Sequence, residues 1–224
     1  MFPLVKTLSS LFRARLIGLM ILCAVLGIIL VIAAVSGLTY LSSIMILPDS
    51  SWLGTALHWI MGGVLTILGW FMLPALIVFI AGMFQETTIH RVEKTHYPET
   101  VRDSPPRFWP DFIHDVKFTL WALFLNILVL PTYLIGIGPV VAVLLNSYLL
   151  GREFFESAAG YHLGKAQAKK LARYHSGTVY FGGFVITAIT VTPLINLFAP
   201  IIALVWMVHI YHSVEALPVQ GDAS

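Results

Sequence analysis

Long uncharged and mostly apolar stretches alternate with short polar ones along this chain of 224 residues. Four stretches contain no Asp, Glu, Lys or Arg, namely residues 16–48, 50–85, 118–150 and 174–214. A helix needs about 20 residues to cross about 30 Å of hydrocarbon, so each stretch is long enough to cross a bilayer once. The pattern therefore predicts an all-α integral membrane protein.

The first half of the chain predicts an interfacial helix followed by two long transmembrane helices. In residues 1–15 the apolar side chains recur at helical spacing, which favours an amphipathic helix lying in the membrane interface. We expect the transmembrane helices at 16–41 and 59–84, with Trp52 and Trp59 as interfacial aromatic residues at the end of the connection. The first run is longer than the apolar core of a secretory signal peptide, so no cleaved signal is expected.

The third uncharged stretch carries Pro131 and the turn sequence Gly136-Ile137-Gly138-Pro139. Proline lacks the N–H that a helix interior uses, so an ordinary transmembrane helix does not fit here. Basic segments flank the stretch on both sides, which places both of its ends on the same side of the membrane. At this length it is too short for two full spans, so we predict a re-entrant helical hairpin over 118–150.

The fourth stretch repeats this design with Pro193 and Pro200, which predicts a second Pro-broken hairpin over 179–212. Matching Pro-interrupted apolar segments are a sequence sign of a transport site; the alternative is two kinked helices that only pack. The expected architecture is one membrane domain, residues 1–214, with two long transmembrane helices and two Pro-broken re-entrant helical hairpins. Residues 215–224 are expected to form a flexible tail.

The charge distribution sets the expected orientation of this domain. Hydrophobic residues make up 58% of the chain and charged residues only 11%, against about a quarter charged in soluble domains. All 13 Lys and Arg fall within 6–15, 91–117 and 152–173, so these segments and the N-terminus are expected in the cytoplasm. The small net charge gives no sign of nucleic-acid binding, and Cys23, the single cysteine, cannot form an intrachain disulfide.

Two arginines at the start of the first long helix form a candidate anion-binding site. Arg13 and Arg15 lie where unpaired N–H groups and the positive end of the helix dipole favour an oxyanion, and guanidinium groups match oxyanion geometry. The alternative is that both arginines only anchor the helix at the cytoplasmic surface. The Gly136–Pro139 turn could likewise offer backbone N–H groups, or serve only as a turn.

A second candidate site lies where the first hairpin returns to the surface. Arg152 and Glu156 are four residues apart and could pair on one helix face, and Glu153 lies beside them. Ionisable residues close to membrane depth are functional candidates, so this group could form the mouth of a pore, with Asn146 deeper inside. The alternative is a solvated interfacial helix with a packing asparagine.

Other chemistry finds no support in the sequence. The eight histidines include His209 and His212, three residues apart, and His90 and His96, six apart. No HExxH or Cys–His grouping accompanies them, and no nucleophile triad or phosphate loop is present. We therefore expect no metal site, no cofactor and no enzymatic activity.

Several motifs together resemble one known family. The segments LNSYLLGREFFESAAGYHL, GIGP, PLINLFAP, MVHIYH and HYPE look like those of the CysZ sulfate-permease family with its etoposide-induced-protein domain. Similarity covers most of the chain and is strongest over 84–212. The matching positions of the bacterial motif are Asn146, Leu149, Leu150, Gly151, Arg152, Glu153, Phe155 and Glu156.

The resemblance implies a homo-oligomeric protein of the bacterial inner membrane that takes up sulfate for cysteine synthesis. The family forms an anion site at a Gly-Leu-Arg-Arg segment that opens the first transmembrane helix. This chain has Phe12-Arg13-Ala14-Arg15 there, so the glycine is absent and the arginines are not adjacent.

The sequence therefore predicts a sulfate or oxyanion permease or channel. In this hypothesis Arg13 and Arg15 bind the ion, and the hairpins line a polar path with Gly136, Gly138, Pro139, Asn146, Arg152, Glu153 and Glu156. The alternative function is a structural or scaffolding membrane protein whose hairpins shape the bilayer or bind partners. The expected partners are sulfate or a related oxyanion, lipid and further copies of the chain.

Overall fold

The computed structural model describes residues 3–45, 52–101 and 108–215, in which every regular element is a helix. These helices fall into two compact units. The smaller unit comprises residues 18–84, and the larger one joins the residues up to 17 with those from 85 onward. The single membrane domain predicted above stays a prediction.

The smaller unit consists of two long apolar helices, α2 (Leu16–Met45) and α3 (Trp52–Met83). The helices contact each other where α3 has Gly69, since a Cβ there would lie 2.6 Å from Val35 and 3.2 Å from Val31. Among the described residues, one helical segment, Leu16–Leu41, is long and apolar enough to cross a membrane. The second long transmembrane helix remains a prediction.

The start of α3 corrects one expectation. Residues 52–58 were predicted to form a connection, but α3 begins at Trp52, so both Trp52 and Trp59 are helical and exposed. Only Asp49 interrupts the uncharged sequence around this point, and no proline ends a helix between the two tryptophans. The helix can therefore extend farther than the tryptophan pattern suggested.

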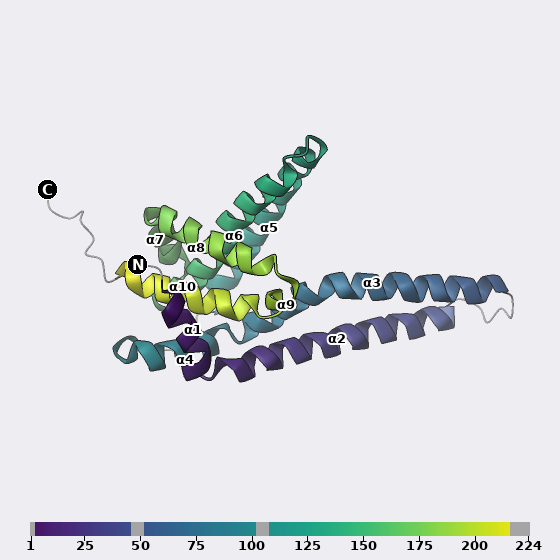
Figure 1. Ribbon diagram of the computed structural model, residues 1–224, viewed down its shortest axis with the longest axis horizontal. Helices are drawn as coiled ribbons and strands as arrows, with labels where there is room; N and C mark the ends of the chain where they lie inside the picture. The colour runs from purple at the N-terminus through teal and green to yellow at the C-terminus, as the bar shows by residue number, and fades with distance from the viewer. Residues whose placement is uncertain (1–2, 46–51, 102–107, 216–224) are drawn as a thin grey trace. The chain divides into compact units, whose positions relative to one another are not determined.

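The larger unit contains the remaining helices and one 3₁₀ turn (Figure 1). Its elements are α1 (Leu4–Arg13), α4 (Gln85–His96), the 3₁₀ turn η1 (Pro98–Thr100), α5 (Phe108–Leu134), α6 (Gly138–Leu163), α7 (Lys165–Tyr174), α8 (Ser176–Thr190), α9 (Pro193–Asn196) and α10 (Ala199–Glu215). The predicted N-terminal helix is confirmed as α1.

Helices α5 and α6 form the first predicted hairpin, but Pro131 does not interrupt it. Pro131 lies inside α5, which ends three residues later at Leu134. Pro131 lacks the N–H that would bond to the carbonyl of residue 127 one turn earlier, so α5 gives up one backbone hydrogen bond there but continues past the proline. The reversal occurs at residues 135–137, where Gly136 adopts φ of +80°, a conformation that favours glycine. Gly138 and Pro139 already belong to the first turn of α6.

The second hairpin consists of α8 and α10, joined through the short helix α9. Pro193 is the first residue of α9 and Pro200 is the second residue of α10. Proline is favoured at the start of a helix because that turn does not use its N–H. These prolines therefore start helices, whereas the sequence analysis expected them to break one.

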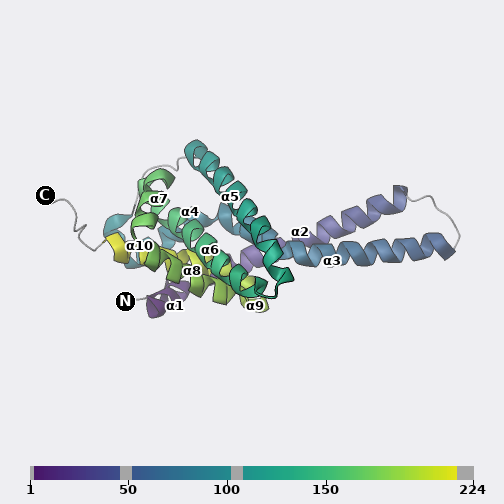
Figure 2. The ribbon, with the colours of Figure 1, turned by 90° about the horizontal axis from the view of Figure 1, so that it is seen from above.

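The two hairpins pack through small residues on α6 and α8, which lie side by side in both views (Figures 1 and 2). A Cβ on Gly151 would lie 2.5 Å from the carbonyl oxygen of Val179. A Cβ on Gly183 would overlap the backbone of Ser147 and Gly151. Glycine thus allows the two backbones to approach more closely than any side chain would permit.

Helix α10 forms the centre of this unit, and α1 is fixed to it by a buried polar contact. Nearly all of α10 is buried, including Trp206 and His209. The Nε2 atom of His209 lies 2.8 Å from the hydroxyl of Ser10 on α1, and Nδ1 lies 2.9 Å from the hydroxyl of Tyr97. The polar side of α1 therefore faces the protein, whereas its Leu4, Val5, Leu8 and Phe12 are exposed.

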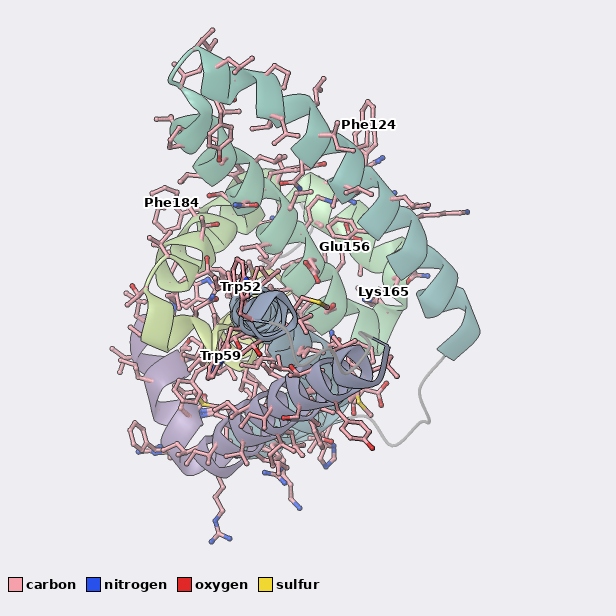
Figure 3. The ribbon with its side chains drawn as sticks, turned by 90° about the vertical axis from the view of Figure 1, so that its right-hand side faces the viewer. Trp52, Trp59, Phe124, Glu156, Lys165 and Phe184 are labelled. Atoms are coloured by element: carbon pink, nitrogen blue, oxygen red, sulfur yellow. The ribbon has the colours of Figure 1, made fainter. Side chains whose placement is uncertain are left out.

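Two aromatic side chains of the hairpin helices are exposed, whereas one carboxylate is buried. Phe124 on α5 and Phe184 on α8 point outward, whereas Glu156 on α6 lies among the helices (Figure 3). The exposed fraction of Glu156 is only 3%. A charged group so deeply buried requires a partner, and that partner belongs to the candidate site.

Candidate anion-binding site

Arg152 lies in the middle of the candidate site and is held by its own helix. Its Nε and Nη2 atoms donate hydrogen bonds of 2.9 and 2.7 Å to Oε1 of Glu156. The predicted pairing of these two residues, one helical turn apart, is therefore confirmed. Because the side chain of Arg152 is 12% exposed and that of Glu156 only 3%, the pair is shielded from water but reaches the surface on the arginine side.

Aromatic rings complete the environment of this guanidinium. Its Nη1 donates a hydrogen bond of 2.8 Å to the hydroxyl of Tyr148, and its carbon lies 5.5 Å from the ring centre of Phe118. Burial disfavours the charged form, but the bonds to Glu156 and Tyr148 outweigh it and raise the pKa of Arg152 above its ordinary value. Arg152 is therefore a permanent cation in a fixed orientation.

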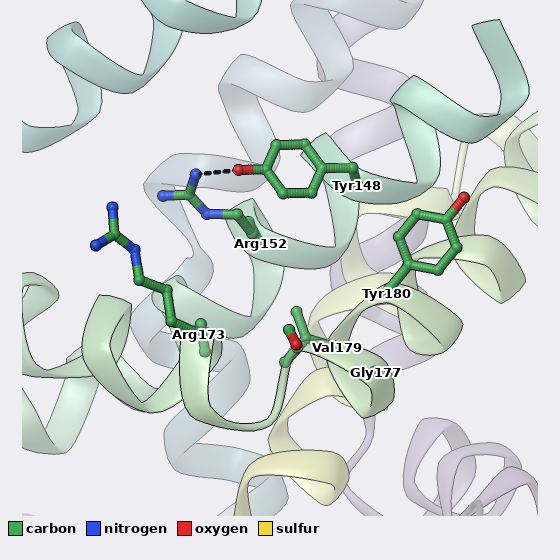
Figure 4. A pocket seen from close by; sticks show the side chains of 8 residues that line it. Tyr148, Arg152, Arg173, Gly177, Val179 and Tyr180 are labelled. Carbon is green, nitrogen blue, oxygen red and sulfur yellow. Dashed lines mark hydrogen bonds between the residues drawn. The ribbon is translucent and has the colours of Figure 1, made fainter. Parts of the chain in front are cut away.

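Two cavities open beside Arg152. One, of about 360 Å³, lies between α6, α7 and α8 and is lined in part by Tyr148, Arg173 and Tyr180. Figure 4 shows the guanidinium groups of Arg152 and Arg173 directed to the same side of this site. The other cavity, of about 260 Å³, is lined by Lys117, Phe118, Trp121, Tyr148, Arg152, Lys169 and Arg173.

The second cavity has the chemical character of an anion site. Among the described residues that line it, four are cations and none is acidic. Because Glu156 neutralises only one positive charge, a local excess of positive charge remains. Guanidinium groups bind oxyanions with two parallel hydrogen bonds, and a volume of about 260 Å³ exceeds the roughly 30 Å³ share of one water several times. A small oxyanion therefore fits here with part of its hydration shell.

Arg13 and Arg15 lie in the turn between α1 and α2. Arg13 is the last residue of α1, and Arg15 directly precedes α2 with φ of +53°. The backbone oxygen of Arg15 accepts a hydrogen bond of 3.3 Å from Nη1 of Arg91. Both predicted arginines are exposed. Burial and the positive charges of Arg13 and Lys6 lower the pKa of His96.

A comparison with protein-family models identifies the family of this chain. The family model described as "Sulfate transporter CysZ/Etoposide-induced protein 2.4" matches residues 4–200. The chain belongs to this family. No curated protein and no solved structure matches the chain. The match covers α1 through α9 and the first residues of α10, and it bears out the resemblance found in the sequence motifs.

In this CysZ-family chain, the residues predicted for the hairpin path do not form one site. Arg152 and Glu156 meet, but Asn146 is exposed, Glu153 is partly buried, and neither lines the two cavities. Gly136 and Pro139 lie at the hairpin turn, and Gly138 is buried against the ring of Tyr133. Arg13 and Arg15 also line neither cavity.

Sequence reasoning missed Lys117, Tyr148, Lys169 and Arg173 as members of the candidate site. A signal for two of them was present, because Lys169 and Arg173 are four residues apart in a basic segment and share one face wherever that segment is helical. The position of that face against α5 and α6 depends on the turn at Gly164, which helix periodicity does not reveal.

Proposed function

We propose that this protein is a sulfate or oxyanion permease of the bacterial inner membrane that supplies sulfate for cysteine synthesis. The observation that carries this proposal is the cavity lined by Lys117, Arg152, Lys169 and Arg173. Family membership supports sulfate as the ion. In this proposal the four cations hold the oxyanion at the end of the first hairpin.

The chemistry of these four residues suits a divalent oxyanion. Arg152 is kept in place by Glu156 and Tyr148, so little side-chain freedom is lost when it binds an ion. Lys169 and Arg173 come from the neighbouring helix α7 and add charge from another direction. A permease must also release its ion, so binding has to be weak. The exposed position of Lys117 and Arg173 keeps water available for release.

Exposed apolar surface at the hairpin tip supports its placement in a bilayer. Leu134, Ile135 and Val140 are 90%, 71% and 64% exposed. Lipid tails can cover such surface without cost, whereas water cannot. In the proposed orientation the basic segments and the N-terminus are cytoplasmic, the hairpins enter the membrane from that side, and α2 and α3 cross it. A homo-oligomer would surround the non-helical backbone at the hairpin turns.

Arg13 and Arg15 are proposed as a second binding position on the same route. Arg15 adopts a conformation rare for residues with a side chain, and backbone strain of this kind is frequent at ligand-binding sites. Arg91 adds a third cation to this turn. The sequence has no ATP-binding motif. The driving force for transport would therefore be a gradient of the ion or the consumption of sulfate inside the cell.

The proposal is tested by sulfate uptake into liposomes that contain the purified full-length chain. Uptake of radiolabelled sulfate should saturate, and selenate or other tetrahedral oxyanions should compete better than chloride. The double variant Lys169→Ala/Arg173→Ala removes two cations of the cavity without breaking the Arg152–Glu156 pair. Charged hydrogen bonds contribute about 1.5–3 kcal/mol each, so uptake should fall about tenfold or more.

Matched control variants show whether a loss of uptake comes from the cavity or the Arg13–Arg15 turn, or only from the removal of positive charge. Lys170→Ala removes a neighbouring exposed cation of α7 that lines neither cavity, and it should leave uptake nearly unchanged. Arg13→Ala/Arg15→Ala tests the turn, with the exposed Lys94→Ala as its control. Uptake that is lost only in the turn variant would move the principal site to Arg13 and Arg15.

The scaffold hypothesis makes the opposite prediction. If the folded, membrane-inserted protein moves no sulfate and none of its competitors, the permease proposal fails. Variants at the hairpin tip, such as Leu134→Ser/Ile135→Ser, would then be expected to alter membrane shape or assembly. If the wild-type protein takes up sulfate, the tip variants test whether uptake requires membrane insertion of the hairpin. The cation variants test whether uptake requires recognition of the ion.

A further inference from the structure

A second ionic cluster lies on helices α4, α6 and α10, apart from the residues of the anion-binding site. Glu93 on α4 is completely buried, and its Oε1 atom lies 2.6 Å from Nε2 of His162 and 3.1 Å from Nε2 of His212. The side chains of His162 and His212 are 16% and 6% exposed. One carboxylate and two imidazole rings from three helices therefore meet at one point.

The other carboxylate oxygen of Glu93 gives an independent reason to look for a ligand. Oε2 is buried and accepts no hydrogen bond from the described part of the protein. A buried carboxylate oxygen without a partner is costly, and buried charges are normally paired or bound to a metal ion. Two histidines on Oε1 leave Oε2 in need of a positively charged partner.

The three side chains provide the ligand set of a zinc ion. Zn²⁺ binds imidazole nitrogen and carboxylate oxygen at about 2.0–2.2 Å, and sites with two histidines and one glutamate are common. A tetrahedral ion keeps such ligand atoms about 3.3 Å apart at these bond lengths. Here the candidate atoms all lie within 4.8 Å of one another, so small side-chain rotations bring them to coordination distance.

Neighbouring groups orient both imidazole rings. His212 stacks on Tyr97 with ring centres 3.9 Å apart, and its Nδ1 lies 3.7 Å from Oε2 of Glu215. His162 stacks on Tyr211 with an interplanar angle of 12°. A carboxylate behind the second ring nitrogen is typical of metal-binding histidines, because it fixes the ring and strengthens the ligand. Both rings thus present Nε2 to Glu93.

We propose that Glu93, His162 and His212 form a binding site for a divalent transition-metal ion, with Zn²⁺ as the best fit. The ion takes the place of the protons on the two Nε2 atoms and joins α4 to α6 and α10. These residues are separated by 69 and 119 positions in the chain, so the ion acts as a long-range cross-link. Three protein ligands leave a fourth position for water or an anion.

The direct test measures zinc bound to the purified full-length protein. The chain is produced with a histidine-free affinity tag, stripped with a chelator, incubated with Zn²⁺ and dialysed. We expect about one zinc per chain by elemental analysis, and a rise in melting temperature of about 5 °C or more at a hundredfold excess over the Kd. This readout does not depend on sulfate transport, so its failure leaves the permease proposal untouched.

Conservative variants assign the bound ion to these residues. Glu93→Gln keeps the size of the side chain, and His162→Gln keeps an N–H donor toward Glu93, yet each removes a good zinc ligand. Both should retain the metal-free melting temperature within a few degrees and lose at least tenfold in zinc affinity. His90→Ala, one helical turn before Glu93 on α4, is the matched control and should bind zinc as wild type does.

A measurement on the unsubstituted protein covers the case in which the variants do not fold. X-ray absorption of the zinc-loaded chain should show nitrogen and oxygen ligands at about 2.0–2.1 Å with the multiple scattering of two imidazoles. Folded wild-type protein that retains no zinc would overturn the proposal. Zinc that persists in both Gln variants, or a spectrum without imidazole, would overturn it as well, since the ion would then lie elsewhere.

Discussion

The two ionic clusters of the larger unit contrast in origin and in exposure. Arg152 and Glu156 are four residues apart on α6, and Arg152 borders two cavities with further cations. Glu93, His162 and His212 come from three helices. The two histidines contact the carboxylate of Glu93, which has no exposed surface. The first cluster is preorganised by one helix and leaves a cation available for a ligand. The second depends on helix packing and directs its groups inward.

This contrast suggests a division of labour within one bundle. The open cluster can exchange an ion with water, as a permease requires. The closed cluster is suited to an ion that stays and stabilises the folded state. Helix α6 carries residues of both clusters, with Arg152 near its middle and His162 at its end. Changes that move α6 should therefore affect both clusters, and changes confined to Arg152 or to His162 should affect only one.

The largest stability effect is expected from breaking the local pair. Arg152→Ala leaves the carboxylate of Glu156 buried without its charged partner, so the free energy of unfolding in detergent should fall by about 3–5 kcal/mol. The double variant Arg152→Met/Glu156→Gln removes both charges and should recover most of that loss. Chemical denaturation compares the two variants. A single variant as stable as the wild type would show that Glu156 is not effectively buried.

A smaller loss is expected from separating α6 and α8. Gly183→Ala places a methyl group against the backbone of Ser147 and Gly151, which cannot move as a flexible side chain could. Overpacking of this kind costs about 1–3 kcal/mol. Sulfate uptake and zinc affinity should both decrease, because both clusters include α6.

Gly177→Ala on the same helix is the control for this substitution. No atom lies within 4 Å of the added Cβ, and alanine favours helix formation by about 1 kcal/mol over glycine. This variant should match or exceed the wild type in thermal stability. Equal effects of the two substitutions would contradict the close approach of the hairpins at Gly183.

The smallest effect is expected at the contact between α1 and the core. Ser10→Ala removes the hydroxyl that lies 2.8 Å from Nε2 of His209, and should lower the free energy of unfolding by about 1 kcal/mol. Ser9→Ala is the matched control, because both hydroxyls donate to the backbone oxygen of Lys6 but Ser9 does not contact His209. Denaturation in detergent should show no loss for Ser9→Ala, and a similar loss in both variants would refute the buried contact.

Much of the helical architecture could be predicted from the sequence. The apolar pattern indicated α1, and the turn sequence around Gly136 indicated the reversal after α5. Local rules of this kind work because a helix satisfies its backbone hydrogen bonds within a few residues. They were less accurate at prolines. Pro131 was expected to interrupt the third stretch, yet it lies inside α5, which tolerates the loss of one backbone hydrogen bond and ends three residues later.

The candidate sites were predicted only where their members are close in sequence. Arg152 and Glu156 share a helix face, so their spacing was sufficient to predict the pair. Lys117 and Arg173 line the same cavity from different helices. Because helical periodicity relates only residues of one helix, it could not predict that they lie together. Sequence spacing also does not reveal the partners of the neighbouring histidines, since His209 contacts Ser10 and Tyr97, whereas His212 contacts Glu93.

The sequence by itself determined the helical and apolar character of this protein, the clustering of its basic residues and the Arg152–Glu156 pair. Each of these follows from composition or from the 3.6-residue period of the helix. Only the tertiary structure decided that α7 completes a cationic cavity beside Arg152, and that Glu93 meets two histidines far away in the chain. The reason is physical: helix formation depends on local hydrogen bonds, whereas the packing that joins distant side chains depends on contacts between whole helices, such as the one that Gly151 and Gly183 permit between α6 and α8.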